Sequence, residues 1–129
     1  MLEILKECPQ VVLLGNSPYT RGIIKSLNRD YFISPILFAS HRPEGCSFFL
    51  QYSFLKQQLP DNEYYTLQSI LDISNEFGRG NNYILIPLSE SLRNFIQTNL
   101  EQLESTYIIS NQSELIAALP SFKSDERNL

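Results

Sequence analysis

Residues 11–18 read Val-Val-Leu-Leu-Gly-Asn-Ser-Pro, and they determine the fold class that the sequence predicts. Four apolar residues that end at a glycine are typical of a buried strand in a parallel sheet. Gly15 permits a sharp turn, Ser17 is a favourable N-cap residue and Pro18 suits the first position of a helix. The stretch predicts a strand that turns into a helix, whose backbone N–H groups would favour an anion above the sheet. The alternative is that the turn only connects the two elements.

The rest of the chain repeats this alternation of strands and helices. Apolar runs predict a short edge strand at residues 52–55 and further strands at 32–38, 83–87 and 106–109. Apolar residues at helical spacing predict helices that follow Ser17, residues 60–62, Ser89 and Asn111. Residues 111–114 also resemble a capping box. Pro35 has no N–H for a sheet, so pairing near it is expected to be one-sided or bulged.

This order of elements predicts an α/β domain of three layers with a Rossmann-like arrangement. Alternating strands and helices form a mostly parallel sheet with right-handed crossovers and helices on both faces. We expect five strands in the order 3-2-1-4-5, numbered along the chain, with crossovers that run in opposite directions from the first and the fourth strand. Ligands of such sheets bind above the carboxyl ends of the strands at this point. Residues 15–18 and 87–90 are therefore expected to face the same crevice.

The composition is that of an ordinary globular protein. With 129 residues, 43% of them hydrophobic, the chain can form one domain, expected over residues 1–120, followed by a polar tail at 121–129. A net charge of −4 and the lack of a basic stripe argue against nucleic acid as a partner. No apolar run approaches the length of a membrane span, and residues 1–10 lack the pattern of a signal peptide. Cys8 and Cys46 are therefore expected as free thiols in the cytoplasm.

The common nucleotide-binding and metal-binding motifs are missing from the sequence. Side chains occupy the second and third glycine positions of a dinucleotide fingerprint, and no acidic residue follows the second strand, although Arg42 could face a phosphate. No P-loop sequence is present. The single histidine, His41, and the lack of ligands at metal spacing argue against a metal site. A nucleophilic Cys46 near His41 would lack the third group of a triad.

The candidate binding residues lie on the two loops that are expected to converge. Gly15 allows close approach of the backbone, and Asn16 and Ser17 offer side-chain hydrogen bonds. On the opposite loop, Ser89 opens a helix and Glu90 could receive an ammonium group, so the crevice would suit an amino acid. The simpler roles are helix caps for the two serines and a carboxylate stabilised by the helix dipole for Glu90. No catalytic residue is predicted in the chain itself.

Three segments of the chain match the pattern of one enzyme family. They are residues 12–27 with the glycine turn, residues 46–49 with a serine-aromatic sequence, and residues 83–103 with a strand that ends in proline before a serine–acid pair. Together they resemble the amino-terminal (pre-ATP-grasp) domain of ATP-grasp ligases, especially D-aspartate ligases and carbamoyl-phosphate-synthase-like carboxylate–amine ligases. The resemblance covers roughly residues 10–119. Leu88 and Glu90 stand where many relatives have Thr and Asp, which leaves the substrate open.

The resemblance implies that the chain is the front part of a longer ATP-dependent ligase. In such an enzyme ATP phosphorylates a carboxylate, and an amine then attacks the acyl phosphate. This domain would line the side of the acceptor, a small carboxylate or amino acid. ATP and Mg²⁺ would be bound by a downstream ATP-grasp domain of the same or a neighbouring chain, and no cofactor is expected in this domain. The alternative is a stand-alone Rossmann-like module that binds a nucleotide or dinucleotide, or that has a regulatory role.

Overall fold

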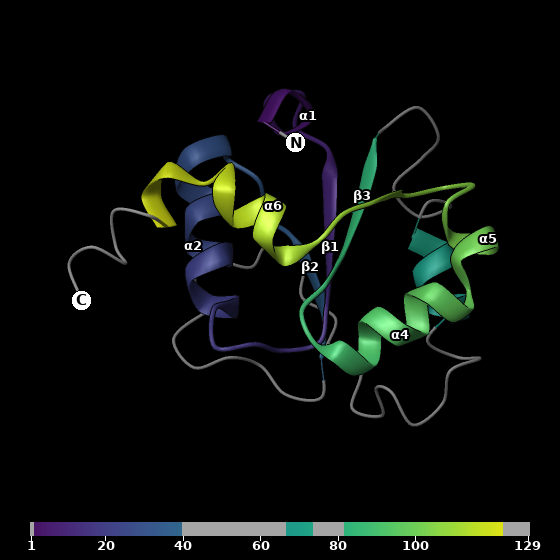
Figure 1. The fold of residues 1–129 in the computed structure, drawn as a ribbon. Coiled ribbons are helices and arrows are strands. Elements are labelled where there is room, and N and C mark those ends of the chain that lie inside the picture. Colours follow the sequence, from purple (N-terminus) through teal and green to yellow (C-terminus); the bar gives the residue numbers. More distant parts are fainter. Residues whose placement is uncertain (1, 40–66, 74–81, 123–129) are drawn as a thin grey trace.

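The computed structural model describes residues 2–39, 67–73 and 82–122, which form helices and strands in alternation (Figure 1). Their bounds are α1 Leu2–Lys6, β1 Gln10–Leu14, α2 Thr20–Tyr31, β2 Ile36–Phe38, a helix over 67–73, β3 Tyr83–Pro87, α4 Glu90–Thr98, α5 Leu100–Leu103, β4 Ile108–Ile109 and α6 Gln112–Ala117. The expected edge strand at 52–55, together with His41, Arg42 and Cys46, lies outside the described residues. Within them, Cys8 is a free thiol, as predicted.

The four described strands form one parallel sheet in the order β2-β1-β3-β4. Val12 at the centre of β1 pairs with Ile36 of β2 on one side and with Leu85 of β3 on the other. Strands β1, β2 and β3 consist almost entirely of buried apolar residues, as the short apolar runs predicted, whereas neither residue of the edge strand β4 is buried. The α/β class and the order of these four strands are therefore confirmed. The crossovers diverge between β1 and β3, because α2 leads toward β2 and α4 leads toward β4.

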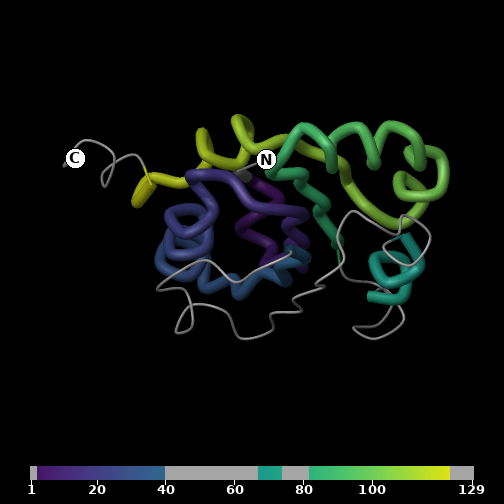
Figure 2. The backbone as a smooth tube through the Cα atoms, turned by 90° about the horizontal axis from the view of Figure 1, so that it is seen from below, coloured from purple at the N-terminus to yellow at the C-terminus, as the bar shows by residue number. Residues whose placement is uncertain are grey.

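Helices cover both faces of the sheet, so the described residues form three layers (Figures 1 and 2). Alternate residues along β1 belong to different cores: Val11 and Leu13 pack with α2 and α6, whereas Val12 and Leu14 pack with α4, α5 and the helix over 67–73. The second core includes Tyr107, whose hydroxyl donates to the carbonyl of Ile70 at 2.6 Å. Burial, together with the neighbouring Tyr83, raises the pKa of Tyr107 far above its ordinary value.

The second strand is shorter than the sequence predicts. Residues 32–38 were expected to form it, but α2 continues to Tyr31 and β2 begins only at Ile36, after Pro35. Phe32 ends the helix in the left-handed conformation, with φ of 57°, and is 90% exposed. Its N–H bonds the carbonyl of Asn28, whose side chain donates to the carbonyl of Ile33 at 2.7 Å. These local bonds hold the helix end where the apolar run alone predicted a strand.

The chain that follows α6 packs along α2. The Tyr31 hydroxyl donates to the carbonyl of Ala118 at 2.6 Å, and the N–H and hydroxyl of Ser121 both donate to the Asp30 carboxylate. Phe122 is 8% exposed and lies against Gly22, where a Cβ would come within 2.8 Å of its ring. The packed structure thus includes Ser121 and Phe122, which the sequence analysis placed in the polar tail.

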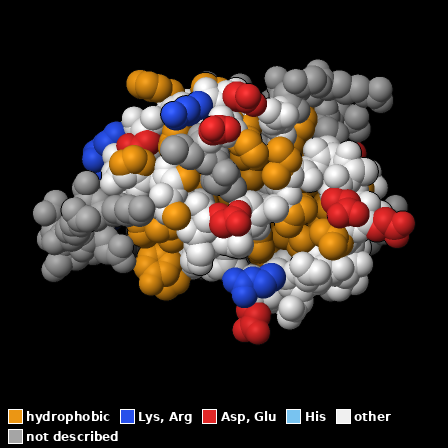
Figure 3. Space-filling model, turned by 45° about the horizontal axis from the view of Figure 1, so that its top comes forward, with side chains coloured by type: hydrophobic (Ala, Val, Ile, Leu, Met, Phe, Trp, Pro, Cys, Tyr) orange, Lys and Arg blue, Asp and Glu red, His pale blue; other side chains and the backbone are white. Residues whose placement is uncertain are grey.

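The surface of the described residues is mixed in character. On the face seen in Figure 3, acidic and basic side chains lie among apolar and neutral ones, and no stripe of one sign crosses it. Among the residues that the structure describes, no helix is both long enough and apolar enough to cross a membrane.

Candidate functional site

The loop between β1 and α2 (residues 15–19) begins with a glycine that the fold requires. Gly15 has a φ of +86°, a conformation that other residues adopt only with strain, and its N–H donates to the carbonyl of Phe38 at 2.7 Å. A Cβ on Gly15 would lie 2.6 Å from Cδ1 of Leu92 and 3.0 Å from Oγ of Ser89. The first loop therefore lies directly against the start of α4.

Ser17 was predicted to cap α2, but the structure gives it another role. The helix begins at Thr20 with Tyr19 as its N-cap residue, and Pro18 lies in the preceding turn rather than at the first helical position. The Ser17 hydroxyl accepts from the N–H of Tyr19 at 3.1 Å and donates to Oε1 of Gln112 in α6 at 2.7 Å. Thr20, which is buried, accepts from the N–H of Ser17 at 2.8 Å and donates back to its carbonyl at 3.0 Å.

This turn forms because Ser17 and Thr20 satisfy one another's polar groups, so the chain closes on itself before the helix begins. A proline at the second position of such a turn is favourable, since its fixed φ suits that position. Ser17 ties the first loop to α6, which lies far along the chain.

The loop between β3 and α4 consists of Leu88 and Ser89. The N–H of Leu88 donates to the carbonyl of Leu14 at 2.7 Å, which joins this loop to the end of β1. Ser89 is the N-cap residue of α4, as predicted, and has an extended backbone, but its side chain makes no capping hydrogen bond. Its hydroxyl lies 3.3 Å from that of Ser91. Glu90 is exposed in the first turn of α4.

The structure thus brings together Gly15 and Ser89 of the five predicted binding residues, and Ser17 is drawn toward α6. Asn16 is half-buried in the first loop, and Glu90 is exposed in the first turn of α4, directly after the second loop. Whether these residues bind a ligand stays a prediction.

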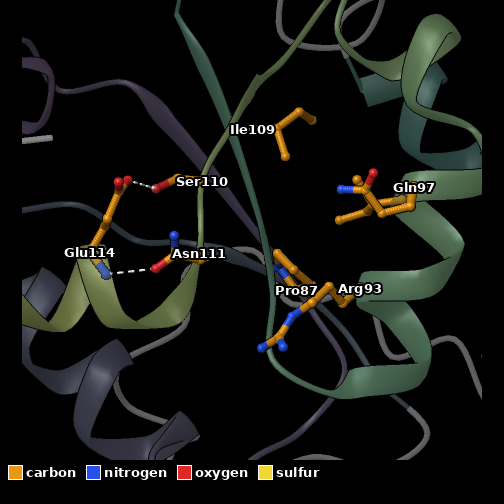
Figure 4. Close-up of a pocket in the computed structure, with 8 residues that line it drawn as sticks. Pro87, Arg93, Gln97, Ile109, Ser110, Asn111 and Glu114 are labelled. Atoms are coloured by element: carbon orange, nitrogen blue, oxygen red, sulfur yellow. Dashed lines mark hydrogen bonds between the residues drawn. The ribbon is translucent and has the colours of Figure 1, made fainter.

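A pocket of about 270 Å³ lies beside these loops, where β3 and β4 end (Figure 4). Pro87 comes from the end of β3, and α4 contributes Arg93, Ile96 and Gln97. The opposite wall is the end of β4 and the start of α6, with Ile109, Ser110, Asn111 and Glu114. A second, more open hollow of about 480 Å³ shares Arg93 and Asn111 with it and extends to Gln112 and Ser113.

The wall formed by residues 110–114 is held by its own hydrogen bonds. Oδ1 of Asn111 accepts from the N–H of Glu114 at 2.8 Å, which is the cap predicted from the sequence. The Glu114 carboxylate does not complete the reciprocal bond of a capping box; it accepts instead from the hydroxyl of Ser110 at 2.7 Å (Figure 4). This arrangement fixes an amide and a carboxylate at the rim of the pocket.

None of the five predicted binding residues lines either of these two pockets, although Ser17 bonds Gln112 at the edge of the open one. The sequence pattern had assigned no binding role to Arg93 and had indicated only a helix cap at residues 111–114. The positions of these residues in the sequence could have indicated the pocket. Arg93, Ile96 and Gln97 share one face of a helix, and the capping residues follow the next parallel strand.

Within residues 2–39, 67–73 and 82–122, no three side chains of His, Cys, Asp or Glu lie close enough together to hold a metal ion. Comparison of the chain with models of protein families, with curated proteins and with solved structures finds no match.

Proposed function

We propose that this chain is the substrate-side, amino-terminal domain of an ATP-dependent carboxylate–amine ligase of the ATP-grasp type. The complete enzyme would activate a carboxylate as its acyl phosphate, and an amine would displace the phosphate. This domain would bind the acceptor, a small carboxylate or amino acid, and pack against the downstream ATP-grasp domain that supplies ATP, Mg²⁺ and the catalytic groups. The proposal includes a Rossmann-like sheet with a fifth strand at 52–55 and a cytoplasmic location.

The observation that supports this proposal best is the contact between the two loops that follow β1 and β3. Gly15 lies against Ser89 and Leu92, and the N–H of Leu88 bonds the carbonyl of Leu14. At this point α2 and α4 leave the sheet toward opposite faces, which is where α/β sheets bind their ligands. The first turns of both helices begin at this edge, and their N–H groups favour a carboxylate by about 0.3–1 kcal/mol each.

The residues on these loops suit an acceptor that carries both charges. Asn16 can bond a carboxylate that is attracted by the helix starts, and Glu90, in the first turn of α4, can bond an ammonium group. In this proposal neither residue takes part in the transfer of phosphate, so each would affect the acceptor and not ATP.

The test is steady-state kinetics of the full-length enzyme with the variants Asn16→Ala and Glu90→Gln. Each should raise the KM of the acceptor by about tenfold or more, the cost of losing one hydrogen bond to a charged group, and leave the KM of ATP unchanged. Gln102→Ala and Glu101→Gln are the matched controls for the lost amide and the lost carboxylate, because both side chains are exposed on α5, which follows α4.

Unchanged acceptor kinetics in both variants would contradict the proposal, since the two loops would then have only a structural role.

Calorimetry of the 129-residue chain separates the proposal from the nucleotide-binding alternative. We expect no tight binding of Mg-ATP, because the sequence has no P-loop, and low-micromolar affinity would support the alternative instead.

A further inference from the structure

The pocket between α4 and residues 109–114 has a cationic side chain, that of Arg93, on its α4 side. Arg93 is exposed and lines both hollows. Among the described residues no carboxylate forms an ion pair with it. Figure 4 shows its side chain extending from α4 toward the loop that carries Asn111. Guanidinium groups bind carboxylates through two parallel hydrogen bonds, which makes this position suited to a carboxylate ligand.

The middle of the pocket is apolar and lies beneath a polar rim. Ile96 is 1% exposed and belongs to the core, and Pro87 and Ile109 lie beside it at the ends of their strands. Gln97, one turn along α4 from Arg93, adds an amide to the rim. The volume of the pocket, about 270 Å³, is slightly below the range of about 300–1,000 Å³ that is typical of sites for drug-sized ligands. The pocket therefore suits a metabolite with a short apolar body.

The opposite wall carries a negative charge that is fixed in place. The Glu114 carboxylate accepts a hydrogen bond from Ser110, and the N–H of Glu114 is bonded to Asn111, so this side chain is oriented before any ligand arrives. A carboxylate can accept more than one hydrogen bond, so Glu114 can also bond a donor of a ligand. It would repel a simple anion such as phosphate, just as Arg93 would repel a simple cation.

From these features we infer that the pocket binds a small monocarboxylate that carries a hydrogen-bond donor near its acid group. The carboxylate pairs with Arg93, the short apolar body lies over Pro87, Ile96 and Ile109, and an ammonium or hydroxyl group donates to Glu114. Both amino acids and hydroxy acids have this chemistry. The pocket would bind such a ligand whether or not the chain belongs to a ligase.

The test is titration of the 129-residue chain, labelled with ¹⁵N, followed by NMR. The probes share one carbon skeleton: valine, its hydroxy-acid analogue α-hydroxyisovalerate, isovalerate without the donor, and valinamide without the carboxylate. Valine or α-hydroxyisovalerate should shift the amides of residues 93–97 and 109–114. Isovalerate and valinamide should each bind at least about tenfold more weakly than valine, because each lacks one charged or charge-assisted contact. The stronger of the first two probes identifies the source as amino acid or hydroxy acid.

Two variants assign the contacts. Arg93→Gln should weaken binding of valine and isovalerate alike by about tenfold or more, whereas Glu114→Gln should weaken valine or α-hydroxyisovalerate and leave isovalerate nearly unchanged. Arg29→Gln on α2 and Glu101→Gln on α5 are matched exposed controls, and neither should matter. Equal binding of valinamide and valine, no effect of Arg93→Gln, or no response to any acid in the panel would overturn the inference. These results are independent of the acceptor kinetics of Asn16 and Glu90 variants.

Discussion

The two loops that meet at the carboxyl edge use the same residue in different ways. Each follows a buried strand and contains a serine before a helix, at Ser17 and at Ser89. In the first loop the serine lies three residues before the helix, and its hydroxyl makes two hydrogen bonds, one of them to α6. In the second loop the serine immediately precedes the helix, and its hydroxyl makes no capping bond and lies 3.3 Å from that of Ser91.

This difference arises from neighbours that are distant in sequence. Ser17 is tied to Gln112, and the turn it forms with Thr20 delays the helix. Ser89 contacts the first loop mainly through packing against Gly15. The comparison shows that the first loop is held by side-chain hydrogen bonds, whereas the second is positioned by the backbone bond of Leu88 and its half-buried serine makes no capping bond.

The largest expected effect comes from filling the contact between the loops. Gly15→Ala places a Cβ 2.6 Å from Leu92 and forces an alanine to a φ of +86°. Strain and overpacking together should lower the free energy of unfolding by about 2–4 kcal/mol, measured by urea denaturation. Gly22→Ala is the matched control. A Cβ at Gly22 would meet only the ring of Phe122, at 2.8 Å. Because alanine also stabilises a helix by about 1 kcal/mol relative to glycine, Gly22→Ala should lower the free energy of unfolding by less than Gly15→Ala does.

A loss for Gly15→Ala no larger than that for Gly22→Ala would mean that the first loop can move away from α4. The close contact of the two loops would then not be a fixed property of the site.

The next effect concerns the bond between the first loop and α6. Ser17→Ala removes the hydrogen bond to Gln112 and leaves the N–H of Tyr19 without this acceptor, so it should cost about 1–2 kcal/mol of stability. A double-mutant cycle with Gln112→Ala should give a coupling energy of about 1 kcal/mol, because the two side chains contact each other directly. A coupling energy near zero would show that the bond contributes nothing and that Ser17 acts only within its own turn.

Much of this architecture follows from the sequence, because short apolar runs and helical spacing report burial directly. The four described strands and their order were predicted from residues such as Val11 to Leu14 and the run before Pro87. The cap at Asn111 was also predicted, since it depends on residues close together in the chain. The contact of the two loops follows from the strand order, because the carboxyl ends of neighbouring parallel strands lie side by side.

Other features could not be predicted, because tertiary contacts decide them. Phe32 looked like the start of a strand, yet it is a left-handed helix end held by Asn28. Ser17 looked like a cap, yet its partner is Gln112, far along the chain. The pocket at Arg93 is formed by side chains from a helix and from a distant loop, and each alone has an ordinary surface pattern.

The smallest expected effect distinguishes a structural serine from one available to a ligand. Because the Ser89 hydroxyl makes no capping bond, Ser89→Ala should change the free energy of unfolding by at most about 0.5 kcal/mol, less than the roughly 1 kcal/mol that a true side-chain cap contributes. If the proposed ligase function holds and Ser89 contacts the acceptor, the same variant of the full-length protein should raise the acceptor KM without changing stability. A stability loss as large as that of Ser17→Ala would contradict this difference, since Ser89 would then cap α4 in solution and the two loops would use their serines alike.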